Sequence, residues 1–215
     1  MGRILYNNVR LNMRKTVWRI IMAKLYFKYG SMGSSKTAQA LITKYHYEEK
    51  GMTVWLVKPS ADTRDGEIVL RSRVGLEANA EVVAPQTDVL DRFSLREKVD
   101  VIIVDECQFM TTQQIDQLRY IVDVYNIPVL CFGLRTDFLS TLFDGSRRLF
   151  EVADTISEIK AICDCGAKAT TNARIDAEGY IVTEGDQLLL GGNDRYLAMC
   201  HKCWIRNIRE HRKVK

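Results

Sequence analysis

The sequence predicts an α/β fold, a parallel sheet flanked by helices, followed by a small module organised by cysteines. Short apolar runs alternate along the chain with helix-forming runs, a pattern typical of parallel sheets whose strands are buried on both faces. A turn rich in glycine and serine, residues 30–37 (GSMGSSKT), separates the first apolar run from the first helical run. Four of the six cysteines form two close pairs after residue 160.

Length and composition are those of an ordinary globular protein, and we expect no membrane partner. The chain has 215 residues, of which 47% are hydrophobic and 27% charged, which suits one domain or one domain with a small module. It lacks a run of about 18 apolar residues, the minimum for a membrane span, and we expect a cytoplasmic location. The net charge of +4 hides an acidic body: residues 1–21 carry +5, residues 205–215 carry +4, and residues 22–204 carry −5. An acidic body argues against nucleic acid as a partner.

Residues 1–21 form a basic N-terminal extension without the features of a secretory signal, which needs a continuous apolar segment and a small-residue cleavage site. The lack of acids resembles an organelle presequence, but serine is absent. Met22 directly precedes the first apolar run, so we prefer a mis-assigned start, with a disordered or loosely docked tail as the alternative. The expected organisation is therefore an extension (1–21), an α/β domain (22–159), a cysteine module (160–204) and a basic tail (205–215), which is either a charged helix or disordered.

The turn at residues 30–37 has the layout of a phosphate-binding loop. It follows a predicted strand at 24–29 and opens a predicted helix at 38–50, which Gly51 is placed to cap. Backbone N–H groups at such a helix N-terminus bind phosphates; Lys36 can reach the phosphates and the Thr37 hydroxyl can ligate Mg²⁺. Ser35 departs from the pattern G-x-x-x-x-G-K because it stands in place of the second glycine. A chance turn is the alternative.

A second phosphate-site motif comes later in the chain. The apolar run 99–104 reads as a buried strand and ends in Asp105-Glu106, the Walker B arrangement, which places a carboxylate beside Mg²⁺. Acids also occur simply where strands leave a core, but both motifs in the expected order predict a P-loop nucleotide-binding fold. The other predicted elements are strands at 53–57, 80–84 and 128–132 and helices at 87–98 and 113–125. The polar stretch 58–79 is expected to be a binding loop.

The late cysteines, Cys163 with Cys165 and Cys200 with Cys203, favour a structural tetrahedral Zn²⁺ site in a reducing compartment, with free thiols as the alternative. Cys163 and Cys165 are one residue closer than in the usual zinc knuckle, and Gly166 relieves the turn. His201 is expected to be exposed rather than coordinating. The other two cysteines, at positions 107 and 131, are expected to be core thiols.

Several motifs in register resemble the cytosolic (type II) thymidine kinases over residues 22–204. They are residues 105–109 (DECQF), 133–138 (GLRTDF) and 145–149 (GSRRL), the loop 62–64 (DTR), the stretch 191–196 and the cysteine module. The resemblance implies a P-loop NTPase-like sheet with a zinc-ribbon-like lid. It also implies transfer of the γ-phosphate of ATP to the 5′-hydroxyl of thymidine, and of deoxyuridine.

The resemblance assigns roles to individual residues. Glu106 matches the general base, Thr37 and Asp105 the Mg²⁺ site, and Asp62 and Arg64 supporting groups near the phosphates and the base. The ATP site would comprise Gly30, Ser31, Met32, Gly33, Ser34, Ser35, Lys36, Thr37, Asp105, Glu106, Cys107 and Gln108. The thymidine site would comprise Met32, Phe109, Leu134, Phe138, Phe143, Asn172, Leu189, Gly191, Gly192 and Tyr196. Residues 182–195 would form a lasso closing over the nucleoside, and its glycines allow close backbone approach.

The family also implies a homotetramer and thymidine triphosphate as a feedback inhibitor. Two other functions stay open. A P-loop ATPase with a nucleic-acid-binding zinc ribbon would use Glu106 to activate water, and it predicts a basic cysteine module, whereas residues 160–204 carry balanced charges. A non-catalytic nucleotide-binding regulator would not need Glu106.

Overall fold

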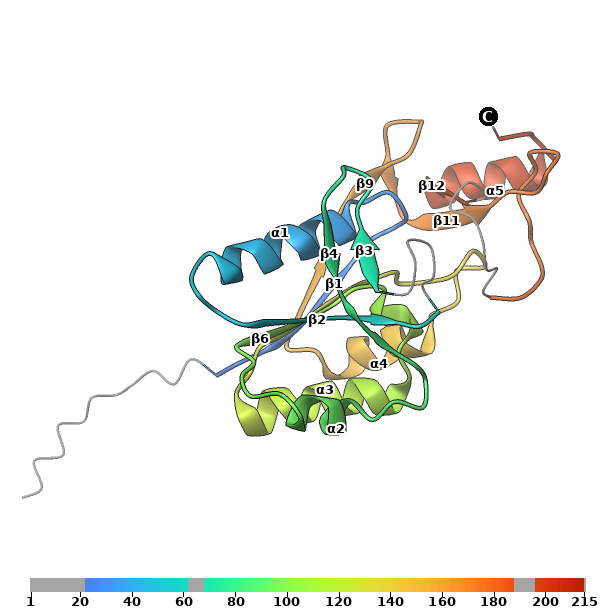
Figure 1. Cartoon of the computed structure of the whole chain (residues 1–215). Helices are drawn as coiled ribbons and strands as arrows, with labels where there is room; N and C mark the ends of the chain where they lie inside the picture. The colour runs from blue at the N-terminus through green and yellow to red at the C-terminus, as the bar shows by residue number, and fades with distance from the viewer. Residues whose placement is uncertain (1–21, 62–67, 188–195, 215) are drawn as a thin grey trace, which may run out of the picture.

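The computed structural model describes residues 22–61, 68–187 and 196–214. The expected N-terminal extension, the loop residues Asp62 and Arg64, and the lasso residues Leu189, Gly191 and Gly192 lie outside this part of the chain. A sheet with the strand order β5-β2-β6-β7-β1-β8 forms the centre, and all of its pairings are parallel (Figure 1). Its strands are β1 (Leu25–Tyr29), β2 (Val54–Pro59), β5 (Glu81–Val83), β6 (Val101–Val104), β7 (Val129–Gly133) and β8 (Thr155–Glu158). The parallel sheet expected from the sequence is confirmed.

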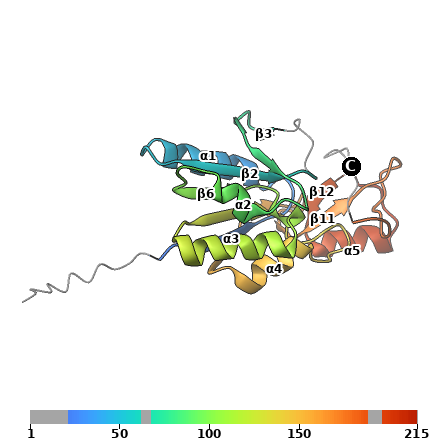
Figure 2. The ribbon, with the colours of Figure 1, turned by 60° about the horizontal axis from the view of Figure 1, so that its bottom comes forward.

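Helices cover both faces of this sheet. Helix α1 (Lys36–Glu48) lies on one face, and α2 (Val89–Ser94), α3 (Thr112–Tyr125) and α4 (Asp144–Val152) lie on the other (Figures 1 and 2). Within the described chain, no helix is both long and apolar enough to span a membrane.

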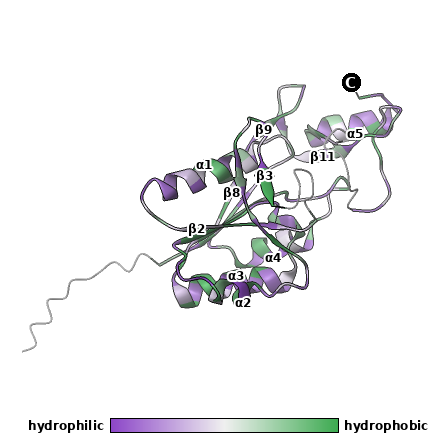
Figure 3. Ribbon diagram, viewed as in Figure 1, coloured by the Kyte–Doolittle hydropathy of each residue, from purple (hydrophilic) through white to green (hydrophobic). Residues whose placement is uncertain are grey.

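The core divides into two layers because successive side chains of a strand point to opposite faces. On β6, Ile102 packs in the cluster that contains Leu118 of α3, whereas its neighbour Ile103 packs in the cluster that contains Leu41 of α1. Burial of each such side chain contributes about 1.5–3 kcal/mol. The central strands are accordingly apolar and the helices two-sided (Figure 3). This double burial explains why the strands read as continuous apolar runs.

The structure corrects several expectations. The stretch 58–79 is not a loop throughout, because β3 (Val69–Arg71) and β4 (Glu77–Asn79) pair as an antiparallel hairpin. Strands of three residues are too short to show periodicity, and the turn relies on Gly75, with φ +87°. Helix α2 is shorter than the expected 87–98. Helix α4 and strand β8 were not expected from the periodicity.

A small module follows β8 and lies beyond one end of the sheet (Figures 1 and 2). It contains β9 (Ala161–Ile162) paired with β10 (Lys168–Ala169), β11 (Thr171–Arg174) paired with β12 (Tyr196–Met199), and helix α5 (His201–Arg209). Its core consists of Ala169, Ala173, Met199 and three cysteines. We call the described residues from 160 onward the cysteine module. Of the two alternatives for the tail, the structure has a helix as far as Arg209.

The junction between β1 and α1 contains an unusual residue. Ser35 precedes the helix with φ +63° and ψ +27°, in the left-handed region, and its side chain does not cap the helix. This is the position where the phosphate-loop pattern has glycine. A side chain in this region costs about 1–2 kcal/mol because Cβ approaches the carbonyl oxygen. Ser35 is therefore strained, and the surrounding sheet and helix hold it in place.

We expect Ser35→Gly to raise the free energy of unfolding by about 1 kcal/mol, because glycine adopts this conformation without strain. Urea denaturation monitored by circular dichroism measures the change. Ser34→Gly is the matched control: Ser34 has no positive φ, so the same replacement there should lower stability by up to about 1 kcal/mol. Equal effects of the two replacements would contradict the assignment of strain to Ser35.

Candidate active site

The phosphate-binding loop lies at the carboxyl end of β1 and is held by hydrogen bonds to its own backbone. The Lys36 Nζ donates to the Ser31 carbonyl at 2.9 Å, and the Ser34 amide donates to the same oxygen at 3.2 Å. A Cβ at Gly30 would collide with Ser34 Oγ and with the Ile159 carbonyl, which explains the glycine. The first turn of α1 has neither an acidic residue nor a side-chain cap. Its N-terminal amides therefore favour an anionic ligand.

Asp105 joins this loop to the end of β6. It is fully buried, and the Thr37 hydroxyl donates to its Oδ2 at 2.7 Å. Burial, and secondly the neighbouring Glu106 carboxylate, raise the pKa of Asp105 to about 7, although Thr37 and Lys36 act in the opposite direction. Its Oδ1 has no hydrogen-bond partner in the described chain. A divalent cation beside Thr37 and Asp105 would satisfy this oxygen and favour the ionised carboxylate.

Glu106 lies at a strained position directly after Asp105. Its φ is +50°, and its side chain is buried except for 7% of its surface. Gln108 orients this carboxylate: its Nε2 donates to Glu106 Oε2 at 2.5 Å, and its Oε1 accepts from the Leu134 amide at 2.9 Å. A Cβ at Gly133 would lie 2.6 Å from Gln108 Oε1, so this close approach requires glycine. Backbone strain held by dense surroundings is typical of functional sites.

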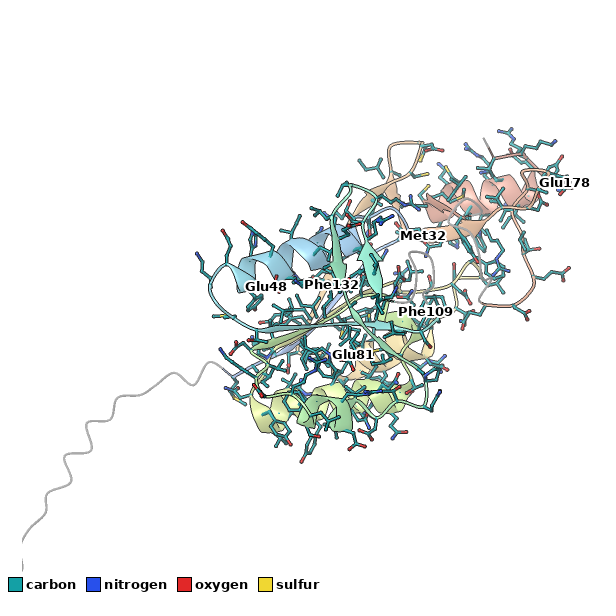
Figure 4. All side chains as sticks on the ribbon, in the orientation of Figure 1. Met32, Glu48, Glu81, Phe109, Phe132 and Glu178 are labelled. Carbon is teal, nitrogen blue, oxygen red and sulfur yellow. The ribbon has the colours of Figure 1, made fainter. Side chains whose placement is uncertain are left out.

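Aromatic side chains gather beside these carboxylates. The rings of Phe109 and Phe143 form an edge-to-face pair with centroids 5.5 Å apart. Leu134 is buried, and its carbonyl accepts from the Ser146 hydroxyl at 2.6 Å. Met32 and Phe109 lie at the end of the sheet that faces the cysteine module (Figure 4). Apolar groups of this kind suit a flat, weakly polar ligand.

A second aromatic group lies where the cysteine module meets the sheet. The Arg174 guanidinium lies 3.7 Å from the centre of the Phe138 ring, and its Nε donates to the Tyr196 hydroxyl at 3.0 Å. Arg174 also donates to the Asp186 carbonyl at 2.6 Å. The interpretation of the sequence missed Arg174, because a single arginine on a short strand gives no local signal of this role.

Asn172 is buried, and main-chain groups bond to both ends of its side-chain amide. It is 4% exposed, the Met32 amide donates to its Oδ1 at 2.7 Å, and its Nδ2 donates to the Thr136 carbonyl at 3.1 Å. The structure thus brings together the phosphate loop, Asp105, Glu106, Cys107, Gln108 and the described aromatic residues.

The four late cysteines form a cluster that could hold a metal ion. Their sulfur atoms all lie within 4.8 Å of one another, and Cys165 and Cys200 are 3.6 Å apart. A tetrahedral Zn²⁺ with four thiolates needs sulfurs about 3.8 Å apart. Hydrogen bonding to the Cys200 and Cys165 sulfurs raises the pKa of Cys203 to about 12, so a bound cation would be needed to make all four thiolates at neutral pH. His201 is exposed and outside the cluster.

The two remaining cysteines are core thiols, as expected. Cys107 and Cys131 are both fully buried. Burial, together with the Cys131 thiol, raises the pKa of Cys107 well above its ordinary value, so this thiol stays protonated.

Comparison with known proteins agrees with this geometry. The family model described as thymidine kinase matches residues 23–204. The thymidine kinase of Enterobacteria phage T4 is 41% identical over 186 residues, which cover 85% of this chain and 96% of that protein. The thymidine kinases of Shewanella oneidensis and Novosphingobium aromaticivorans are 41% and 45% identical over 184 residues, which cover 84% of this chain and 96% of each relative. The resemblance inferred from the motifs is confirmed: the chain belongs to the thymidine kinase family.

Proposed function

We propose that the protein transfers the γ-phosphate of ATP to the 5′-hydroxyl of thymidine, and of deoxyuridine, giving the monophosphate and ADP. The hydrogen bond between Thr37 and Asp105 is the observation that carries the proposal. It joins a loop suited to phosphate binding to a carboxylate pair suited to metal binding and proton transfer. The relatives named above carry the corresponding activity in their names.

Residues 30–37 would hold the ATP phosphates, and Asp105 to Gln108 would complete the nucleotide site. Lys36 would stabilise charge that develops on the transferred group. Thr37 and Asp105 would hold Mg²⁺, which neutralises phosphate charge when bound. Asp62 and Arg64, which lie outside the described residues, would support the phosphates and the base.

Glu106 would act as the general base. As the nucleoside 5′-oxygen forms its bond to the γ-phosphorus, the bond from that phosphorus to the bridging oxygen of ADP breaks, and the hydroxyl proton passes to Glu106. The Gln108 amide would orient the Glu106 carboxylate for this proton transfer.

The nucleoside pocket would use the apolar groups beside Glu106. We propose Met32, Phe109, Leu134, Phe138, Phe143 and Tyr196 as its walls, with Leu189, Gly191 and Gly192 contributed by a closing lasso at residues 182–195. Closure excludes water and so limits ATP hydrolysis. Residues 22–159 would then be the kinase domain and residues 160–204 a lid with one structural Zn²⁺, with residues 1–21 and 205–215 as terminal segments of a cytoplasmic protein.

We expect purified protein with Mg²⁺-ATP to phosphorylate labelled thymidine. Glu106→Gln should keep ATP affinity but lower kcat about 10²–10⁴-fold, the usual contribution of a general base. Glu97→Gln, a neutralisation at an exposed glutamate, is the matched control and should leave kcat unchanged. Near-normal turnover in Glu106→Gln would remove Glu106 as the base. ATP hydrolysis stimulated by DNA, without thymidine phosphorylation, would favour the alternative of a nucleic-acid-dependent ATPase.

The cysteine cluster should contain about one Zn per chain by elemental analysis, as four thiolates require. Cys165→Ser should lose the metal and lower the melting temperature, because the module has little core apart from its ligands. Cys131→Ser removes a buried thiol far from the cluster and should retain the metal. A folded, active and zinc-free preparation would refute the proposed metal.

We propose a homotetramer, inhibited by thymidine triphosphate, on the strength of the family. Large apolar side chains are exposed on α1, at Ile42 and Tyr45, and on the hairpin β3–β4, at Val74 and Leu76. Val74, 69% exposed, is costly to leave in water. Sedimentation velocity should show four chains per particle, and Val74→Asp should give smaller particles if the hairpin is an interface. A monomer at micromolar concentration with ATP present would contradict the proposal.

A further inference from the structure

One side chain of the cysteine module reaches the phosphate-binding loop. Asn172 lies on β11, whose four residues are all buried. Its Oδ1 accepts from the Met32 amide at 2.7 Å, although the two residues are 140 positions apart. Its Nδ2 donates to the Thr136 carbonyl at 3.1 Å. Both ends of this amide are therefore engaged by main-chain groups.

These two partners belong to different halves of the active site. Met32 is the third residue of the phosphate loop. The loop's other described hydrogen bonds run to β7, from the Gly30 amide to Gly133, to Asp105 after β6, from the Thr37 hydroxyl, or within the loop and the start of α1. Thr136 follows β7 in the segment that leads to Phe138 in the proposed nucleoside pocket. Asn172 thus links the donor loop, the nucleoside wall and the module in one set of hydrogen bonds.

The module makes other described contacts with the segment after β7, but none of these contacts reaches the phosphate loop. Arg135 donates to the Thr170 carbonyl at 3.2 Å, Gln187 donates to Asp137 at 3.0 Å, and Arg174 lies over Phe138. In the described chain, Asn172 is the residue through which the module hydrogen-bonds to the loop. A shift of β11 when the module closes over a nucleoside must therefore move or release the Met32 amide.

We propose that Asn172 is a positioning residue that couples closure of the cysteine module over thymidine to the conformation of the phosphate loop, so that thymidine and ATP bind cooperatively. This inference rests on the proposed function, because it takes thymidine as the acceptor. It gives Asn172 a role other than the base contact expected from the family, because main-chain groups bond to both its carbonyl oxygen and its amino group. Coupling of this kind is reciprocal, because each ligand raises the affinity of the protein for the other ligand by the same factor.

Isothermal titration calorimetry tests the coupling by measuring the affinity of the protein for a non-hydrolysable ATP analogue with Mg²⁺, in the presence and absence of thymidine. In the wild type, we expect thymidine to tighten the analogue about fivefold or more, within the usual range of coupling between sites. In Asn172→Ala, the factor should fall to within about twofold of unity, while each ligand alone binds within about threefold of its wild-type affinity. Asn172→Asp keeps an acceptor for the Met32 amide, so its coupling should stay closer to that of the wild type than to that of the alanine variant.

Asn207→Ala is the matched control, since it truncates an asparagine on α5 of the same module whose side chain makes no hydrogen bond in the described chain. It should leave the coupling unchanged. Hydrogen exchange followed by NMR gives a second readout: the Met32 amide should exchange faster in Asn172→Ala, while the Gly30 amide, bonded to Gly133, keeps its protection.

Coupling that survives Asn172→Ala, or unchanged exchange at the Met32 amide, would overturn the inference. Weaker binding of thymidine alone, with the coupling intact, would show that Asn172 contacts the base instead. A wild type that binds both ligands independently would also overturn it. Failure of the wild type to bind thymidine at all is a different result, which contradicts the proposed function.

Discussion

The hydrogen bond from the Thr37 hydroxyl to Asp105 joins the two parts of the chain on which the site depends. These residues follow β1 and β6, which are not neighbours, because β7 lies between them in the sheet. Only a parallel arrangement brings the carboxyl ends of all three strands to one edge. The burial that raises the pKa of Asp105 comes from the same packing. The fold thus creates a carboxyl group that is costly to ionise unless a cation lies beside it.

Two residues with positive φ, Ser35 and Glu106, flank this hydrogen bond. Ser35 directly precedes Lys36, and Glu106 directly follows Asp105. The proposed mechanism uses both of these neighbours. Conformations of this kind persist only where the surrounding structure over-determines them. Here the sheet on one side and the Gln108 side chain on the other hold Glu106 in place. The strained backbone at Glu106 therefore helps to set the orientation of this carboxylate.

The strands and the phosphate loop could be predicted from the sequence because burial on both faces and the loop's residue types are local signals. Helix α4 could not. It begins with Asp144, Gly145 and Ser146, which are poor helix formers, but a Cβ at Gly145 would lie 2.6 Å from the Cys107 carbonyl. The close packing of α4 against Cys107 therefore requires a glycine, and this poor helix former weakens the local sequence signal for the helix. Strand β8 gives no apolar run because it is a partly exposed edge strand.

The contacts that assemble the candidate site could not be predicted from local sequence patterns, for a different reason. The bonds of Asn172 and Arg174 join segments that are distant in sequence, and nothing near either residue indicates its partner. The motifs supplied the identities of Phe138 and Tyr196, but the structure adds the guanidinium between them. The sequence motifs could predict which residues line a pocket, but not the long-range contacts that position those residues.

That arrangement links the cysteine cluster to the candidate site, although the cluster lies outside it. Ala173 and Met199, on the paired strands β11 and β12, pack in one small core with three of the cysteines. The same strands carry Asn172 and Arg174, which contact the phosphate loop and Phe138. A metal bound by the cysteines would therefore also restrain β11, which hydrogen-bonds to the phosphate loop and to the segment after β7. β11 thus connects the cysteine cluster to both the phosphate loop and the segment after β7.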